Sequence, residues 1–257
     1  MSLDLSPRPG AASTRAMVRS QTAMELRLLA RNGEQILVTL VIPLLLLVMG
    51  TRAGSIVDLG EGRTIDIIAP GVLALAVLST SFTSLAISTG FDRRYGVLKR
   101  LGASPLPRSG LLVAKVLAVV VVELVQLVVL VGAALALGWQ PEGGATAWLW
   151  LLALAGLGTA AFGALGLLIA GTLRAEATLA LANLVYILLL VGGGLIVPLS
   201  RYPEGVQRGL ELLPSGALGQ GLRDAFAGDG VGVAPVVVLA VWALVAGAVT
   251  SRTFRWE

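Results

Sequence analysis

Six long apolar stretches, separated by short polar links, fill this chain from about residue 36 to residue 250. Five of them contain no Asp, Glu, Lys or Arg, namely 35–51, 67–91, 143–173, 177–200 and 230–251. The sixth, 111–138, holds only Lys115 and Glu123. A helix needs about 20 mainly apolar residues to cross the core of a bilayer. Six such stretches in 257 residues leave too little polar surface for a soluble domain, so the sequence predicts a polytopic membrane protein.

The apolar stretches are continuous, whereas a lipid-facing β-barrel alternates apolar and polar residues. We therefore expect an all-α fold, with a transmembrane domain over residues 14–257 behind a flexible polar leader, residues 1–13. Residues 14–32 predict an amphipathic helix lying along the membrane interface, with a solvated tail as the alternative. The predicted spans are approximately 35–52, 67–90, 111–138, 147–171, 178–198 and 232–251.

The basic residues lie at the ends of the predicted spans rather than in one patch. With the N-terminus in the cytoplasm and six spans, fourteen of the 19 Lys and Arg residues fall inside and five outside. The positive-inside rule then places both termini in the cytoplasm. The composition is rich in Arg, Ala, Gly, Val and Leu and suggests a bacterial source, hence the bacterial cytoplasmic membrane. The sequence pI near 10.1 follows from these scattered cations, so we expect no nucleic-acid partner.

Several classes of intramembrane enzyme lack their essential residues in this chain. Histidine is absent, although metalloproteases and rhomboid-like proteases need it, and cysteine is absent as well. A paired-aspartate protease needs two carboxylates inside spans, whereas only Glu123 lies in one. Neither Lys99 nor Lys115 follows a glycine, so neither belongs to a phosphate-binding P-loop. We expect no catalytic residues, no metal site and no cofactor bound by this chain.

Four polar side chains fall within the predicted third and fifth spans. Glu123 and Gln126 are three residues apart, and so are Asn183 and Tyr186. A carboxylate at the centre of a membrane helix costs about 2.5–3.5 kcal/mol, so Glu123 should face protein or water or be protonated. The four residues could line a path for amphiphilic or cationic substrates. Alternatively they form interhelical hydrogen bonds of about 0.6 kcal/mol each, which we favour for Asn183 and leave open for Glu123.

Small residues suggest close helix packing at two places. In the fourth span, Ala155, Thr159 and Gly163 form one row with a period of four, and a second row begins at Gly156. Such rows let helix backbones approach closely. Gly192–Gly194 near the end of the fifth span predicts either a local break in that helix or another close approach.

The longest basic link follows the second predicted span. Residues 92–102 predict one short amphipathic helix with Tyr95, Leu98 and Leu101 on one face, ended by Ser104-Pro105. A rigid basic helix that protrudes from two spans is suited to being pushed by a soluble partner. The alternative, a loop anchored to anionic lipid headgroups, explains the charge but not the apolar stripe.

The link between the fifth and sixth spans predicts two further helices. Val206, Leu210 and Leu213 share a helix face between Pro203 and Pro214. Ser215 could then cap a second helix that contains Leu218, Leu222 and Phe226. Such helices could dip into the membrane and close an outer exit, whereas amphipathic loops are the milder possibility.

Three segments resemble the membrane subunit of ABC type-2 transporters, which include the daunorubicin-resistance-type exporters. The run DRRYGVLKRLGASPL, residues 92–106, is similar to the family's acidic-Arg…Gly…Leu…Ser/Thr-Pro-Leu signature. It departs from that signature mildly, with Asp92 where Glu is frequent and Val97 where Thr is frequent. Pro70-Gly71 resembles the Pro-Gly pair at the start of the second span, and the run from Pro198 resembles the short outer helices.

The resemblance implies that this chain is the permease of an ATP-driven exporter of drugs, lipids or other amphiphilic molecules. The alternative is a non-transporting membrane scaffold or an ATP-independent carrier. It implies separate ABC ATPase subunits that hold ATP and Mg, and a second permease, identical or a paralogue. The residues that it assigns to coupling with the ATPase are Asp92, Arg93, Arg94, Tyr95, Gly96, Leu98, Arg100 and Leu101. Those that it assigns to an outer gate are Pro198, Pro203, Leu210, Pro214, Leu222 and Phe226.

Overall fold

The structure, a computed structural model, describes residues 12–33, 37–53 and 63–254, and within these ranges it contains helices and no strand. The leader predicted over residues 1–13 therefore lies almost wholly outside the described residues. The α-helices are α1 (Thr14–Arg31), α3 (Ile42–Ala53), α4 (Thr64–Leu78), α5 (Leu85–Arg94), α6 (Val97–Gly102), α7 (Arg108–Ala136), α8 (Gly144–Thr172), α9 (Ala175–Gly192), α10 (Glu204–Glu211), α11 (Pro214–Ala227) and α12 (Val233–Thr253). The π-helical segments η1 (Leu37–Val41) and η2 (Ser79–Ser84) and the 3-10 turn η3 (Leu199–Arg201) complete the fold.

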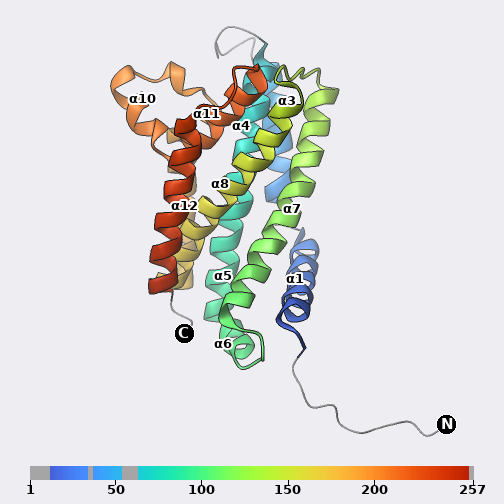
Figure 1. Ribbon diagram of the computed structural model, residues 1–257, viewed down its shortest axis with the longest axis vertical. Helices are drawn as coiled ribbons and strands as arrows, with labels where there is room; N and C mark the ends of the chain where they lie inside the picture. The colour runs from blue at the N-terminus through green and yellow to red at the C-terminus, as the bar shows by residue number, and fades with distance from the viewer. Residues whose placement is uncertain (1–11, 34–36, 54–62, 255–257) are drawn as a thin grey trace, which may run out of the picture.

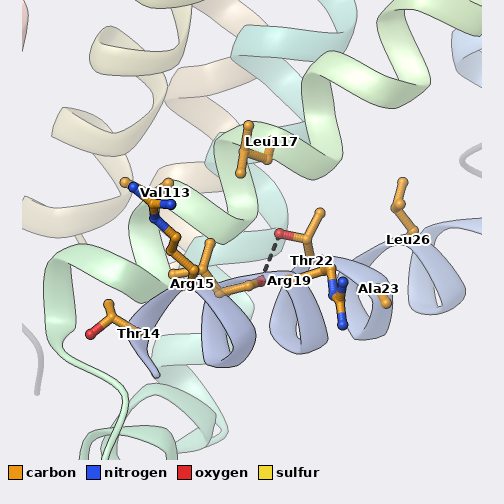
Figure 2. Close-up of a pocket in the computed structure, with 9 residues that line it drawn as sticks. Thr14, Arg15, Arg19, Thr22, Ala23, Leu26, Val113 and Leu117 are labelled. Carbon is orange, nitrogen blue, oxygen red and sulfur yellow. Dashed lines mark hydrogen bonds between the residues drawn. The ribbon is translucent and has the colours of Figure 1, made fainter. Parts of the chain in front are cut away.

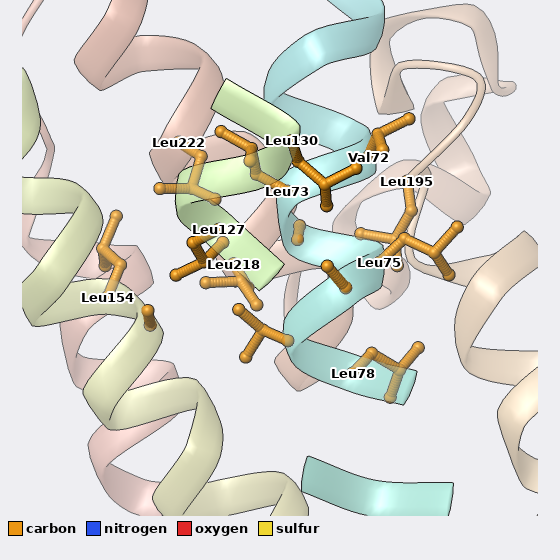
Figure 3. Packing of buried hydrophobic residues seen from close by; sticks show 14 of the residues in the cluster. Val72, Leu73, Leu75, Leu78, Leu127, Leu130, Leu154, Leu195, Leu218 and Leu222 are labelled. Atoms are coloured by element: carbon orange, nitrogen blue, oxygen red, sulfur yellow. The ribbon is translucent and has the colours of Figure 1, made fainter. Parts of the chain in front are cut away.

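The centre of the fold is one continuous helical rod formed by α4, η2 and α5. It runs for 31 residues from Thr64 to Arg94, and its apolar part is almost entirely buried. The neighbouring helices α7, α8 and α11 pack around α4, as Figure 1 shows for their axes. Figure 3 shows Leu73 and Leu75 of α4 among Leu127 of α7, Leu154 of α8 and Leu218 of α11. This cluster is the main apolar core.

Five helices are long and apolar enough to cross a membrane, which agrees with a multi-pass all-α membrane protein. They are Thr64–Arg94, Ser109–Ala136, Gly144–Thr172, Ala175–Gly192 and Val233–Thr253. The first predicted span, 35–52, appears as a shorter apolar helix over Thr39–Arg52. Because this helix is below the length of about 20 residues that a bilayer core requires, the described residues give five candidate spans rather than six.

Two helix ends differ from the approximate bounds of the predicted spans. The fifth span ends at Gly192 instead of residue 198, because the chain turns at Gly193–Gly194 and Gly194 adopts a φ of +61°. The helix ends at these glycines, and a Cβ on Gly193 would collide with the Ser215 side chain, so a helix break and a close approach occur together. The helix of the second predicted span begins at Thr64, so Pro70 lies in the interior of α4.

Basic residues predicted to lie inside and outside the cell are at opposite ends of the bundle. In Figure 1, α1, α6 and the end of α12 lie at one end of the bundle, whereas α10 and α11 lie at the other. The predicted inside residues Arg19, Arg100 and Arg252 therefore belong to one end. The predicted outside residues Arg208 and Arg223 belong to the opposite end.

The two rows of small residues in α8 have different environments. Ala155, Thr159 and Gly163 are buried inside the bundle, which agrees with close packing. Gly156 begins the second row and is exposed, with nothing within 4 Å of the position where a Cβ would lie.

Candidate functional site: the elbow after α5 and the 193–227 segment

The elbow, residues 92–102, is two helices joined by a sharp turn. The rod ends at Arg94, Tyr95 and Gly96 form the turn, and α6 follows as a six-residue helix. Gly96 has a φ of +67°, a left-handed conformation that a residue without a Cβ adopts at little cost. The prediction of one helix over 92–102 is therefore wrong. Tyr95 and Leu98 do not share a face either, since Tyr95 is 64% exposed and Leu98 only 1%.

Asp92 belongs to a buried ionic triad at the base of the elbow. The Lys115 Nζ atom of α7 donates hydrogen bonds to Asp92 Oδ2 at 2.6 Å and to Glu25 Oε2 of α1 at 3.1 Å. The Lys115 side chain is only 3% exposed, so its buried ammonium group depends on these carboxylate partners for compensation of its charge. The triad joins α1, α5 and α7. Sequence reasoning missed Glu25 and Lys115 as partners of Asp92, because a lysine near a span end can reach the membrane interface without an acidic partner.

The two arginines that follow Asp92 contact two further helices. The Arg93 guanidinium donates a 2.7 Å hydrogen bond to the carbonyl of Ala170 near the end of α8. The Arg94 guanidinium forms an ion pair with Glu176 in the first turn of α9. Three consecutive residues therefore tie the elbow to α7, α8 and α9 in turn.

The predicted coupling residues fall into two groups. Asp92, Arg93 and Leu98 are turned toward the bundle, and Leu101 is half-buried. Tyr95 and Arg100 are exposed, and so is Lys99, which the prediction omitted. Tyr95 is steadied by stacking on Phe91, with ring centroids 6.0 Å apart. The elbow thus presents an aromatic ring and two cations on a helix that is fixed from within.

The 193–227 segment at the opposite end contains the two predicted short helices, but they differ in burial. No residue of α10 is buried, and Val206 is 51% exposed. In α11 most residues are buried, including Leu218, Leu222 and Phe226. The N-cap of α11 is Leu213, and Pro214 takes the first position, so the prediction that Ser215 caps this helix is wrong. Ser215 lies one residue inside α11 and is fully buried.

The remaining predicted gate residues divide in the same way. Pro198 and Pro214 are buried where the chain leaves α9 and where α11 begins. Pro203 is exposed before α10, and Leu210 is half-buried. The structure therefore gathers the gate residues of α11 against the core and leaves those of α10 at the surface.

Arg223 links α11 to the turn that follows α9. Its Nη2 atom donates hydrogen bonds to the carbonyl oxygens of Gly194 at 2.7 Å and Leu195 at 2.9 Å. Burial lowers the pKa of Arg223 to about 10, which leaves it cationic at neutral pH. The α4 backbone passes close by, because a Cβ on Gly71 would collide with the Leu195 carbonyl oxygen. The Pro-Gly pair of α4 thus packs directly against the turn whose carbonyl oxygens accept from Arg223.

An aromatic cluster holds the other end of α11. Phe226 lies edge-to-face against Trp139 and Trp148, with centroid distances of 4.7 and 5.2 Å. The Glu142 backbone N–H also donates a 2.9 Å hydrogen bond to the Phe226 carbonyl. α11 is therefore fixed to the α7–α8 turn as well as to α9.

The polar residues of α7 form hydrogen bonds between helices. The Thr159 hydroxyl of α8 lies 2.8 and 2.7 Å from the two carboxylate oxygens of Glu123, which is 4% exposed. Thr80 in η2 donates a 2.6 Å hydrogen bond to Gln126 Oε1, and the Gln126 amide donates to the Thr39 carbonyl. The π-helical segment is the polar feature that sequence reasoning missed, and its run STSFTS was the available signal.

The structure does not bring the four predicted path residues together. Glu123 and Gln126 lie inside the bundle on α7, whereas Asn183 is exposed on α9 and Tyr186 is half-buried there. No group of three or more His, Cys, Asp or Glu residues that could hold a metal ion occurs in the described ranges.

Comparison with known proteins places this arrangement in a family. The family model described as ABC-2 type transporter matches residues 13–227, which is well over half of the chain. The matched region begins before α1, contains the whole elbow and ends with α11. None of the curated proteins that were compared matches the chain. The match shows that this multi-pass membrane protein belongs to the ABC-2 type transporter family and is a transporter permease.

Proposed function

We propose that this chain is the permease subunit of an ATP-driven exporter, of the daunorubicin-resistance type, that moves amphiphilic molecules such as drugs or lipids out of the cytoplasm. The observation that carries this proposal is the elbow. It exposes Tyr95, Lys99 and Arg100 while neighbouring residues fix it to three helices. A soluble ATPase that moves this surface displaces all three helices together.

The elbow is suited to transmit force because it is short and anchored from inside. Leu98 is buried against the bundle, so α6 cannot swing freely around Gly96. A push on Arg100 is carried through Asp92, Arg93 and Arg94 to α7, α8 and α9. The central rod ends at the same place, so α4 moves with it.

The energy source is proposed to lie in a separate ABC ATPase that binds ATP and Mg. The sequence carries no Gly-Lys-Ser/Thr element, and the link that contains the elbow is too short for an ATPase domain. We further propose that two permeases pair around a central path, with the elbow and both termini in the cytoplasm. The helix Thr39–Arg52 would then complete six spans together with the residues that precede it.

The 193–227 segment is proposed to close the exit at the opposite end. Arg223 and Phe226 hold α11 against the core, whereas α10 is exposed and makes few buried contacts. Opening would move α11 as a unit with the turn at Gly194–Leu195. On α9, the exposed Asn183 and half-buried Tyr186 are the path residues that a substrate could still reach.

Reconstitution with the cognate ATPase tests the proposal. The wild-type pair should hydrolyse ATP faster when an exported compound is present. In the double variant Tyr95→Ala with Arg100→Glu, the increase in ATP hydrolysis caused by the compound should be at least about tenfold smaller. The variant removes the exposed aromatic ring and reverses a charge on the surface that the ATPase contacts. Arg252→Glu at the exposed end of α12 is the matched control, because it reverses one charge outside both the elbow and the 193–227 segment, and it should behave as wild type.

Two results would contradict the proposal. A chain that transports in liposomes without any ATPase is an ATP-independent carrier. A chain that binds no ATP-hydrolysing subunit and moves no compound across a panel is a membrane scaffold.

A further inference from the structure

An open apolar groove of about 540 Å³ lies between α1 and the first turns of α7. Val18, Thr22 and Leu26 of α1 line one side, and Val113 and Leu117 of α7 line the other. Figure 2 shows the Arg15 side chain reaching from α1 toward Val113. Arg19, one turn further along α1, also lines the groove.

The charge around the groove is positive and uncompensated. Arg15 and Arg19 are exposed, and in the described part of the chain neither forms a hydrogen bond or an ion pair. The acidic residue of α1, Glu25, is already engaged by Lys115. A ligand that places an anionic group at this rim would therefore meet two free guanidinium groups, which bind phosphate oxygens well.

The apolar floor of the groove continues along α7. Val113, Leu117, Val121 and Leu124 follow at helical spacing and are 49%, 43%, 42% and 45% exposed. With a rise of about 1.5 Å per residue, this stripe extends about 16 Å, roughly half the thickness of a bilayer core. An acyl chain of one leaflet fits that length.

We propose that this groove is a binding site for an anionic phospholipid from the leaflet next to α1. The phosphate lies against Arg15 and Arg19, and one acyl chain follows Val113, Leu117 and the stripe beyond. The bound lipid would join α1 to α7 beside the Lys115 triad. The inference does not depend on the proposed export, because the site is formed by α1 and α7 alone.

Native mass spectrometry of the full chain in detergent, titrated with phosphatidylglycerol or phosphatidylcholine, tests the site. Each basic residue near a membrane surface strengthens the binding of anionic lipid about fivefold. The double variant Arg15→Gln with Arg19→Gln should therefore weaken phosphatidylglycerol binding about 25-fold. The matched control is Arg27→Gln with Arg31→Gln, which removes the same charge from exposed positions of α1 outside the groove. These positions lie more than about 10 Å along the helix from Arg19, where charges are largely screened, so binding should change less than about twofold.

A second variant tests the acyl-chain part of the site without changing charge. Thr22→Trp places an indole in the groove and should weaken phosphatidylglycerol binding at least about fivefold. Inorganic phosphate at millimolar concentration should not compete, because it lacks the chain that occupies the stripe.

Each of the following results overturns the proposal. Equal weakening by both arginine double variants indicates diffuse attraction rather than a site. If phosphatidylcholine binds as tightly as phosphatidylglycerol, or if inorganic phosphate competes with phosphatidylglycerol, the ligand of the groove is not an anionic phospholipid. If removal of residues 2–11 increases lipid binding, the chain's own N-terminal residues occupy the groove, and if bound lipid is lost on dimerisation, a second copy does.

Discussion

The elbow and the 193–227 segment are both attached to the central rod, but by different chemistry. The elbow is held mainly by ion pairs, with Lys115 between two carboxylates and Arg94 paired with Glu176, and by one hydrogen bond from Arg93 to the Ala170 carbonyl. The 193–227 segment is held by backbone carbonyls that accept from Arg223 and by aromatic contacts around Phe226. Ion pairs can exchange partners when a protein surface moves, whereas close backbone contacts fix one geometry. The difference indicates that the ionic contacts of the elbow can be exchanged during movement, whereas α11 moves as a unit with the turn after α9.

The largest expected effect comes from removing the buried cation at the elbow. Lys115→Met leaves Asp92 and Glu25 facing each other without a partner. Breaking a buried ion pair costs about 3–5 kcal/mol, and we expect the lower end because both carboxylates keep some exposure. The thermal midpoint of the purified protein should fall by about 6–12 °C.

Lys99→Met is the matched control, since Lys99 is exposed on α6 and its removal should leave the midpoint within about 1 °C. An unchanged midpoint in Lys115→Met would show that the triad does not hold the elbow.

The next effect tests the close backbone contact at the opposite end. Gly71→Ala adds a Cβ that collides with the Leu195 carbonyl, which cannot move without disturbing the Arg223 hydrogen bonds. Overpacking of this kind costs about 1–3 kcal/mol in the free energy of unfolding. Denaturation in detergent measures it.

Gly156→Ala makes the same chemical change at an exposed α8 position with free space around it. It should be neutral or stabilising by up to about 1 kcal/mol, because alanine favours a helix over glycine. Equal effects of the two substitutions would contradict a rigid contact at Gly71.

A smaller effect is expected at the outer ion pair of the elbow. The Arg94 and Glu176 side chains are 48% and 66% exposed, so Glu176→Gln should cost less than about 1 kcal/mol. If the Arg94–Glu176 ion pair breaks and re-forms during transport, Glu176→Gln should change the rate of substrate-stimulated ATP hydrolysis. It should change the thermal midpoint of the protein less. A large stability loss with an unchanged rate would instead make the pair structural.

The smallest effect is expected inside the bundle. Glu123→Gln keeps an oxygen that accepts from the Thr159 hydroxyl, so stability should change by no more than about 0.6 kcal/mol. Transport of each tested compound should stay normal, since Glu123 joins α7 to α8. A selective loss of cationic substrates would return Glu123 to the substrate path.

The length and continuity of the apolar stretches were sufficient to predict the long helices, because five of the stretches form helices that are long and apolar enough to cross a membrane. At Gly192–Gly194 the sequence left a helix break and a close approach open as alternatives, since glycine permits both. The turn at Tyr95–Gly96 was not predicted, because the i, i+3, i+6 spacing of apolar residues also fits a continuous helix. The positive φ of Gly96 accompanies the burial of Leu98 in the bundle, which is a tertiary contact.

The sequence motif marked residues 92–102 as a coupling candidate but did not predict their geometry. The motif located the elbow, yet only the fold shows that Asp92 meets Lys115 and Glu25, which are 23 and 67 residues away in the chain. Glu123 and Gln126 were recognised as unusual, but their partners Thr159 and Thr80 are small side chains without a distinct pattern. Burial of Arg223 against carbonyls likewise has no signature in sequence.

The most direct test of the account is the side of the membrane on which the elbow lies. The chain contains no cysteine, so single-cysteine variants can be labelled cleanly. In intact cells, a membrane-impermeant maleimide should label Arg208→Cys of α10 at once and Lys99→Cys of α6 only after permeabilisation. Immediate labelling of Lys99→Cys, with Arg208→Cys protected, would contradict an elbow that a cytoplasmic ATPase drives.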